Sequence, residues 1–188
     1  MRRLRNFATA HRRVAVLGAA LALGLAGTAA TPASADPAPV VTCAGSALQQ
    51  YSPGLTLTTR PTQVTSNQSY TTCVDATVGP HGGPITSATS SVTFNAPLSC
   101  LVSPPALPVE VTIHWNGGRT STAQTLAVVS RTTGTTIATD TGTITSGLFE
   151  GKVLNVTVVY PALNITDCLL GSGVTQIPGI ATLAVTPV

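Results

Sequence analysis

Residues 109–118, VEVTIHWNGG, decide the fold class of this chain. Their apolar side chains, Val, Val, Ile and Trp, occupy every second position, and polar side chains fill the positions between them. This period of two is typical of a β-strand with one buried face. The closing Asn-Gly-Gly readily adopts the left-handed backbone that a tight β-turn needs. The stretch therefore predicts a strand over 109–115, a turn and a return strand over 120–130.

The same composition extends along most of the chain. Thr, Val and Ile predominate, and charged residues make up only 8% of the sequence. β-branched residues favour pleated sheets over helices. Strand-like runs recur between turn signals such as 51–54 and 79–84, and they are 40–50, 55–59, 69–78, 86–94, 137–144, 153–160 and 181–185. About eight to ten strands at this spacing are typical of a β-sandwich or a β-barrel.

The N-terminus is typical of a secretory signal peptide. Five arginines lie within the first thirteen residues, and small residues at Ala33 and Ala35 precede a cleavage site. The apolar run between them, about 17 residues rich in Ala and Gly, is short for spanning a bilayer. We predict cleavage after Ala35, which leaves no membrane anchor and one secreted domain over 36–188 with a short N-terminal arm, 36–42.

Beyond the leader the chain is weakly charged. Residues 36–188 hold four basic and six acidic side chains, a net charge of −2, so the +3 of the whole chain comes from the leader. The basic residues are scattered. Nucleic-acid binding needs clustered Lys and Arg to neutralise phosphates, so we expect no nucleic-acid partner.

The cysteines predict two disulfides. All four lie beyond the leader, and an even number in a small secreted domain indicates a disulfide framework. Three pairings are open. We favour Cys43 with Cys73, which would tie two early neighbouring strands, and Cys100 with Cys168, which would close the rest of the domain.

No catalytic or metal-binding pattern is apparent. His81 and His114 are isolated, and no CxxC or HxxxH spacing occurs, so we expect no metal and no other cofactor. Nothing in the sequence pairs two carboxylates as glycoside hydrolysis requires, and no G-x-S-x-G elbow is present. The acidic side chains beyond residue 36 are Asp75, Glu110, Asp140, Glu150 and Asp167. We therefore expect a protein that is not an enzyme.

Protein interaction is the favoured function, with two alternatives. The domain has a single lysine, Lys152, although lysines commonly guard the edges of sheets, and an unguarded edge can pair with a partner strand. The first alternative is a protease inhibitor, with the Pro-rich segment 104–108 as its rigid loop. The second is a carbohydrate-binding module that stacks sugar on Trp115. The alternation of 109–115 instead favours Trp115 as a core residue.

The order of several motifs resembles a family of small secreted Streptomyces-type actinobacterial proteins. These motifs are TCAG at 42–45, YSPGLT at 51–56, TC at 72–73, SCL at 99–101, WN at 115–116, GTITSGLFEG at 142–151 and CL at 168–169. Within this resemblance the chain is similar to the adaptor subunit of secreted umbrella-toxin particles, which is held by a large scaffold polypeptide and carries a lectin subunit. The resemblance implies an immunoglobulin-like antiparallel β-sandwich, no enzymatic activity and these two protein partners.

The adaptor resemblance also directs attention to the N-terminal arm. We expect the arm to dock on the scaffold by adding a strand to it. The candidate partner-binding residues are Asp36, Val40, Val41, Thr42, Ala44 and Gly45.

Overall fold

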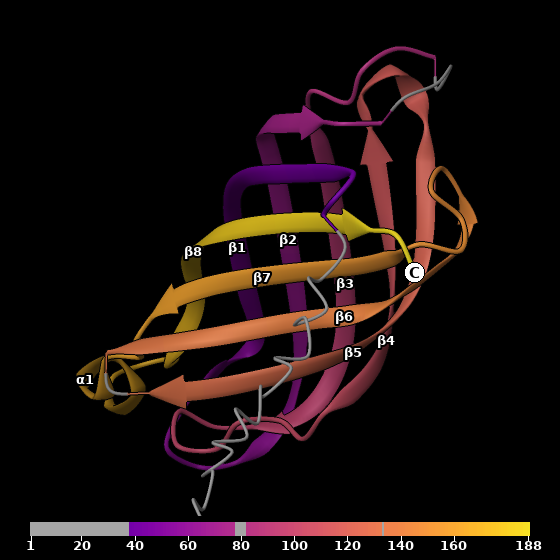
Figure 1. Cartoon of the computed structure of the whole chain (residues 1–188). Coiled ribbons are helices and arrows are strands. Elements are labelled where there is room, and N and C mark those ends of the chain that lie inside the picture. The colour runs from indigo at the N-terminus through magenta and orange to yellow at the C-terminus, as the bar shows by residue number, and fades with distance from the viewer. Residues whose placement is uncertain (1–37, 78–81, 133) are drawn as a thin grey trace, which may run out of the picture. The chain divides into compact units, whose positions relative to one another are not determined.

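Eight antiparallel strands form a closed barrel in the computed structural model, which describes residues 38–77, 82–132 and 134–188 (Figure 1). Each strand pairs with the next along the chain, and β8 pairs with β1. The strands are β1 (Val41–Leu55), β2 (Arg60–Asp75), β3 (Ala88–Leu98), β4 (Leu107–Trp115), β5 (Thr120–Thr132), β6 (Thr135–Gly147), β7 (Val153–Pro161) and β8 (Val174–Thr186). A short 3-10 helix, η1 (Asn116–Gly118), follows β4, and α1 (Ile165–Leu169) lies between β7 and β8.

The all-β prediction is confirmed, but the expected immunoglobulin-like β-sandwich is wrong. A sandwich consists of two sheets with free edges. Here the register from Val41↔Val185 to Gln50↔Gln176 joins the first strand to the last, so a single sheet closes on itself. Both architectures contain short antiparallel strands with alternating faces, and the spacing of strands in the sequence therefore did not separate them.

The predicted alternation places side chains as expected in β4 and β7. In each strand every second residue is buried inside the barrel, while Glu110 and His114 of β4 are exposed on the outside. The inward residues are Val109, Val111, Ile113 and Trp115 in β4, and Leu154, Val156, Val158 and Tyr160 in β7.

Several strand boundaries differ from the prediction. β2 runs without interruption through 60–75. Its first half was not predicted, because its buried side chains include Thr62, Ser66 and Gln68, which do not produce an apolar alternation. β1 continues through the predicted turn at 51–54, and the loop 56–59 replaces a predicted strand. β8 begins at Val174, well before the predicted start at residue 181.

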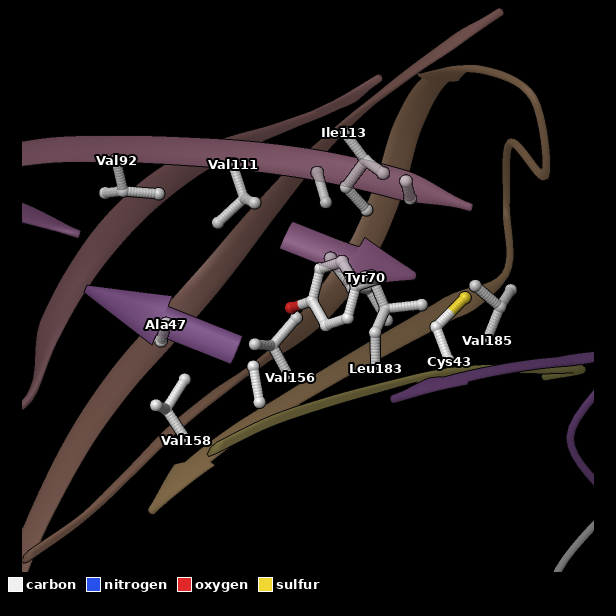
Figure 2. Packing of buried hydrophobic residues seen from close by; sticks show 14 of the residues in the cluster. Cys43, Ala47, Tyr70, Val92, Val111, Ile113, Val156, Val158, Leu183 and Val185 are labelled. Carbon is white, nitrogen blue, oxygen red and sulfur yellow. The ribbon is translucent and has the colours of Figure 1, made fainter. Parts of the chain in front are cut away.

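The two ends of the barrel differ in their interior. At one end, which we call the packed end, β1, β3, β5 and β7 begin, and apolar side chains such as Tyr70, Ile113 and Leu183 converge (Figure 2). At the other end, which we call the polar end, these strands finish, and several polar side chains point inward. The loop 99–106 and α1 belong to the polar end (Figure 1).

Both disulfides are present, in the pairing favoured from the sequence. Cys43 and Cys73 face each other across β1 and β2 near the packed end. Cys100 and Cys168 join the loop 99–106 to α1 at the polar end. Two such bridges are typical of an oxidising environment.

Gly142 of β6 provides a test of the strand register. A Cβ atom at this position would lie 1.9 Å from the carbonyl oxygen of Gln124 and 2.6 Å from the Cα atom of Thr125. These are backbone atoms of the neighbouring strand, which cannot move without breaking the ladder. We expect Gly142→Ala to lower the free energy of unfolding by about 3 kcal/mol, at the upper end of overpacking costs.

Urea unfolding followed by far-UV circular dichroism measures this cost. The control is Thr143→Ala, an exposed neighbour on the same strand, which should change stability by less than about 0.5 kcal/mol. Equal stability of Gly142→Ala and the wild type would show that β5 and β6 do not pair in this register.

Candidate functional site

Four of the six residues that the sequence singled out for partner binding lie inside a strand that is paired on both sides. Val41, Thr42, Ala44 and Gly45 lie in β1, where β2 pairs on one side and β8 on the other. The backbone N–H of Val40 donates to the carbonyl of Val185 at 2.7 Å. Asp36 lies outside the described residues. No unpaired strand edge exists at this position of the closed barrel, so the backbone there is not available for strand addition.

The other predicted features lie on different elements. Trp115 is only 3% exposed, as expected for a core residue. His114 is exposed on the outer wall, and His81 lies outside the described residues. The Pro-rich segment 104–108 spans the end of the loop 99–106 and the start of β4.

The carboxylates of the described residues are likewise dispersed, and only one of them lines an internal cavity. Glu110 accepts a hydrogen bond from Gln124 on the outer wall at 2.7 Å. Asp75 accepts from the backbone N–H groups of Thr77 and Ile85, both at 2.9 Å. Glu150 and Asp167 are exposed. Asp140 lines an internal cavity.

Two small cavities adjoin inside the barrel near its polar end. We call the one of about 30 Å³ the outer cavity and the one of about 40 Å³ the inner cavity. Tyr51, Pro104 and Arg131 line the outer cavity, whereas Ser66 and Asp140 line the inner one. The residues that line both are Gln49, Phe94, Val129, Ala138 and Tyr160.

A chain of hydrogen bonds forms the polar wall of the inner cavity. Ser90 Oγ donates to Gln68 Oε1 at 2.6 Å, and Gln68 Nε2 donates to Ser66 Oγ at 2.8 Å. The hydroxyls of Ser66 and Tyr160 lie 3.4 Å apart and form the last link. Buried polar groups are normally satisfied in this way. The chain orients the Tyr160 hydroxyl at the cavity.

Four other polar groups on the inward faces of the strands have no such hydrogen-bond partner among the described residues. No hydrogen bond reaches the carboxylate of Asp140 from the described part of the chain, and burial raises its pKa to about 6. Over the same residues, the Tyr70 hydroxyl and the Nε atoms of Arg60 and Arg131 are buried without a hydrogen-bond partner. Unpaired buried polar groups are rare in folded proteins, and ligands or ordered waters commonly complete them.

The other interior side chains whose pKa is shifted by burial keep one protonation state near neutral pH. Burial raises the pKa of Tyr160 to about 12, and burial also raises the pKa of Tyr51 and Tyr70 above the ordinary tyrosine value. Burial lowers the pKa of Arg131, but a guanidinium stays charged across the physiological range. Asp140 is therefore the interior group that titrates between pH 4 and 8.

A small second core closes the polar end over the cavities. It contains Leu98, Cys100 and Cys168, so the disulfide between the loop 99–106 and α1 is part of it. Tyr51 and Phe94, which line the outer cavity, pack against both this second core and the main core. The Nη1 of Arg131 donates to the Cys100 carbonyl at 2.7 Å, which ties the cap to the barrel wall. The cavities thus lie between two apolar clusters.

Comparisons with known proteins identify no relative: no family model, no curated protein and no solved structure matches the chain. The resemblance to toxin adaptors therefore stays a prediction. Among the described residues, no three His, Cys, Asp or Glu side chains lie together in a way that could hold a metal ion. In the same part of the chain no helix is long and apolar enough to cross a membrane.

Asp140 was not among the site residues predicted from the sequence. A period of two over 138–144 places Asp140 on the same face as Ala138, Gly142 and Ile144. A carboxylate on a face of small and apolar residues can indicate a buried functional group. The pattern does so only if that face points into the barrel, and the sequence did not show which face points inward.

The buried carboxylate predicts an unusual dependence of stability on pH. The pKa of Asp140 rises from 3.8 to about 6 on folding, so the folded protein keeps a proton that the unfolded chain loses in this window. This contribution to stability is complete below pH 4, is lost as the pH rises to about 6, and stays constant above. It amounts to about 2–3 kcal/mol.

Urea unfolding at pH 4 and pH 7 isolates the effect. Asp140→Asn should remove this dependence on pH. The difference in free energy of unfolding between the variant and the wild type should therefore be about 2–3 kcal/mol more favourable to the variant at pH 7 than at pH 4. Asp167→Asn, which changes an exposed carboxylate, should leave the difference between the two pH values unaltered. Identical profiles for Asp140→Asn and the wild type would show that this carboxylate is solvated.

Proposed function

We propose that this protein is a secreted, non-enzymatic binding protein that holds a small polar molecule inside its barrel. One observation carries the proposal: the Asp140 carboxylate, which accepts no hydrogen bond from the described residues, lines the inner cavity, and Arg131, whose Nε is buried without a partner among them, lines the outer cavity. A core that served only stability would gain from apolar side chains at these positions.

The architecture supports this function. An eight-stranded barrel has an interior that side chains can just fill or that can hold one small ligand. Ligand sites are mostly apolar with a few polar groups that orient the ligand, and the residues around the two cavities have this character. The volumes of about 30 and 40 Å³ suit a molecule of a few non-hydrogen atoms rather than a drug-sized one.

Secretion is part of the proposal and has two supports. The first is the leader over 1–35, with its arginines and its A-x-A cleavage site. The second is the pair of disulfides, which indicates an oxidising compartment. A binding protein that is exported in this way would take up its ligand outside the cell.

A fragment screen by NMR tests the binding function. Compounds of four to eight non-hydrogen atoms should shift the backbone amide signals of Gln49, Ala138 and Asp140, with dissociation constants in the millimolar to micromolar range. Ala138 lines both cavities, so Ala138→Leu should fill them and abolish binding. Thr143→Leu, on the outer face of the same strand, should bind like the wild type. Fragment binding that survives Ala138→Leu would contradict the site.

The outer wall favours a second candidate function, the predicted protein-interaction adaptor. The outward positions of β5, β6, β7 and β8 carry no charged side chain. Exposed apolar residues lie among them, including Leu126, Val128 and the paired Val159 and Ile180, the last 69% exposed. Contiguous exposed apolar side chains are typical of protein-binding surfaces. In this version a partner docks on the wall of the closed barrel rather than on a strand edge.

A pull-down of the tagged protein from the culture medium of its source tests this candidate. The adaptor function predicts stoichiometric recovery of a large polypeptide, with or without a lectin subunit. Ile180→Lys should abolish the recovery, because it charges the most exposed of these apolar side chains, and Glu110→Gln on β4 should not. Recovery of the domain alone would rule the adaptor out under these conditions.

A further inference from the structure

We propose that the ligand of the barrel interior is a small primary amine, held as its ammonium ion against the carboxylate of Asp140. This inference rests on the proposed function, because it names the chemistry of the molecule that occupies the same site. It concerns the inner cavity, which Asp140 lines together with Gln49, Ser66 and Tyr160.

Among the described residues, no cationic side chain pairs with the Asp140 carboxylate. The titratable side chains on the inward faces are Tyr51 on β1, Arg60 and Tyr70 on β2, Arg131 on β5 and Tyr160 on β7. The Nη2 of Arg60 donates to the Gly54 carbonyl. The described inward residues of β3, β4 and β8 include no titratable group. The tyrosines are neutral, and Arg131 lines the outer cavity and binds the Cys100 carbonyl. A buried charge is stable only when it is paired, and a cationic ligand supplies the pair.

The inner cavity offers an ammonium ion the acceptors that it needs. An ammonium group has three donors and no acceptor. Beside Asp140, Gln49 and Tyr160 line the cavity, and a side-chain amide and a hydroxyl can each supply an acceptor oxygen. At about 40 Å³ it is large enough for a group of this size. A second carboxylate here would repel Asp140, and a neutral alcohol would leave its charge uncompensated.

The outer cavity provides space for the hydrocarbon part of the ligand. The two cavities adjoin at Phe94, Val129 and Ala138, which present apolar surface between Asp140 and the cap. A short hydrocarbon chain attached to the ammonium would lie along these side chains. The geometry therefore favours an amine of about four to six non-hydrogen atoms, with its charge at the inner end.

Titrations of the purified protein with propylammonium, 1-propanol and propionate test the inference. The three probes have similar size and differ in charge. At pH 7.5 propylammonium should bind at least tenfold more tightly than 1-propanol, and propionate should not bind. At pH 4.5 the preference should disappear, because Asp140 is then protonated while the amine, like a lysine, keeps its charge.

Asp140→Asn separates the outcomes. The variant should lose the affinity for propylammonium at least tenfold and keep that for 1-propanol, and Asp167→Asn should bind all three probes like the wild type. If 1-propanol binds as tightly as propylammonium, or if Asp140→Asn keeps the amine preference, the amine inference is wrong and the small-molecule site remains. If propylammonium shifts no interior amide, the amine inference is wrong, and the fragment screen with Ala138→Leu decides the proposed function separately.

Discussion

Replacing both Cys100 and Cys168 with serine is expected to lower the free energy of unfolding by about 4 kcal/mol and to open the polar end of the barrel. The bridge closes a loop with a sequence separation of 68 residues, and a loop of this length restricts the unfolded chain strongly. In the folded protein the same bridge joins the loop 99–106 to α1 within the small core that caps the cavities. Its loss therefore affects both the stability and the cap.

Two measurements separate these effects. Urea unfolding under non-reducing conditions gives the free energy, and hydrogen exchange gives the protection of the Gln49 and Asp140 amides beneath the cap. The matched control replaces Cys43 and Cys73, whose sequence separation of 30 predicts a similar loss of about 3.5 kcal/mol. In that control, the protection of the amides at the polar end should fall only as much as the free energy of global unfolding falls. Equal local protection in both double variants would show that the disulfide does not hold the cap.

Trp115→Ala is expected to lower the free energy of unfolding by about 3–5 kcal/mol, the usual cost of removing a buried aromatic side chain. Trp115 is 3% exposed at the packed end, and its ring meets that of Phe149 edge-on, with centroids 5.5 Å apart and an interplanar angle of 86°. Its indole N–H donates to Ser121 Oγ at 2.8 Å. The substitution removes the packing and this hydrogen bond together.

Trp115→Phe provides the matched variant, because it keeps an aromatic ring and removes the indole N–H. It should cost about 1–2 kcal/mol, and urea unfolding followed by circular dichroism measures both variants. The wild-type fluorescence, which comes from this single tryptophan, should resist acrylamide quenching until the protein unfolds. Strong quenching in the native state, or a cost near zero for Trp115→Ala, would mean that Trp115 is exposed and available to stack on a sugar.

The candidate site was only partly predictable. Residues 109–115 and 153–160 showed their buried faces in the sequence, because alternating apolar side chains have the period of a strand. The polar end showed no such signal. Gln49, Ser66 and Gln68 are ordinary in a Thr- and Ser-rich strand, and their inward direction follows from pairing with neighbours that are distant in the sequence.

The sequence by itself determined that the protein is all-β, which residues of β4 and β7 share a buried face, and that four cysteines are available for two bridges. Only the tertiary structure decided that β8 pairs with β1 to close a barrel, and that Asp140 lies inside it. The physical reason is that a period of two assigns side chains to one face of a strand. It does not say which strands pair, and pairing between the two ends of the chain depends on contacts that no local pattern encodes.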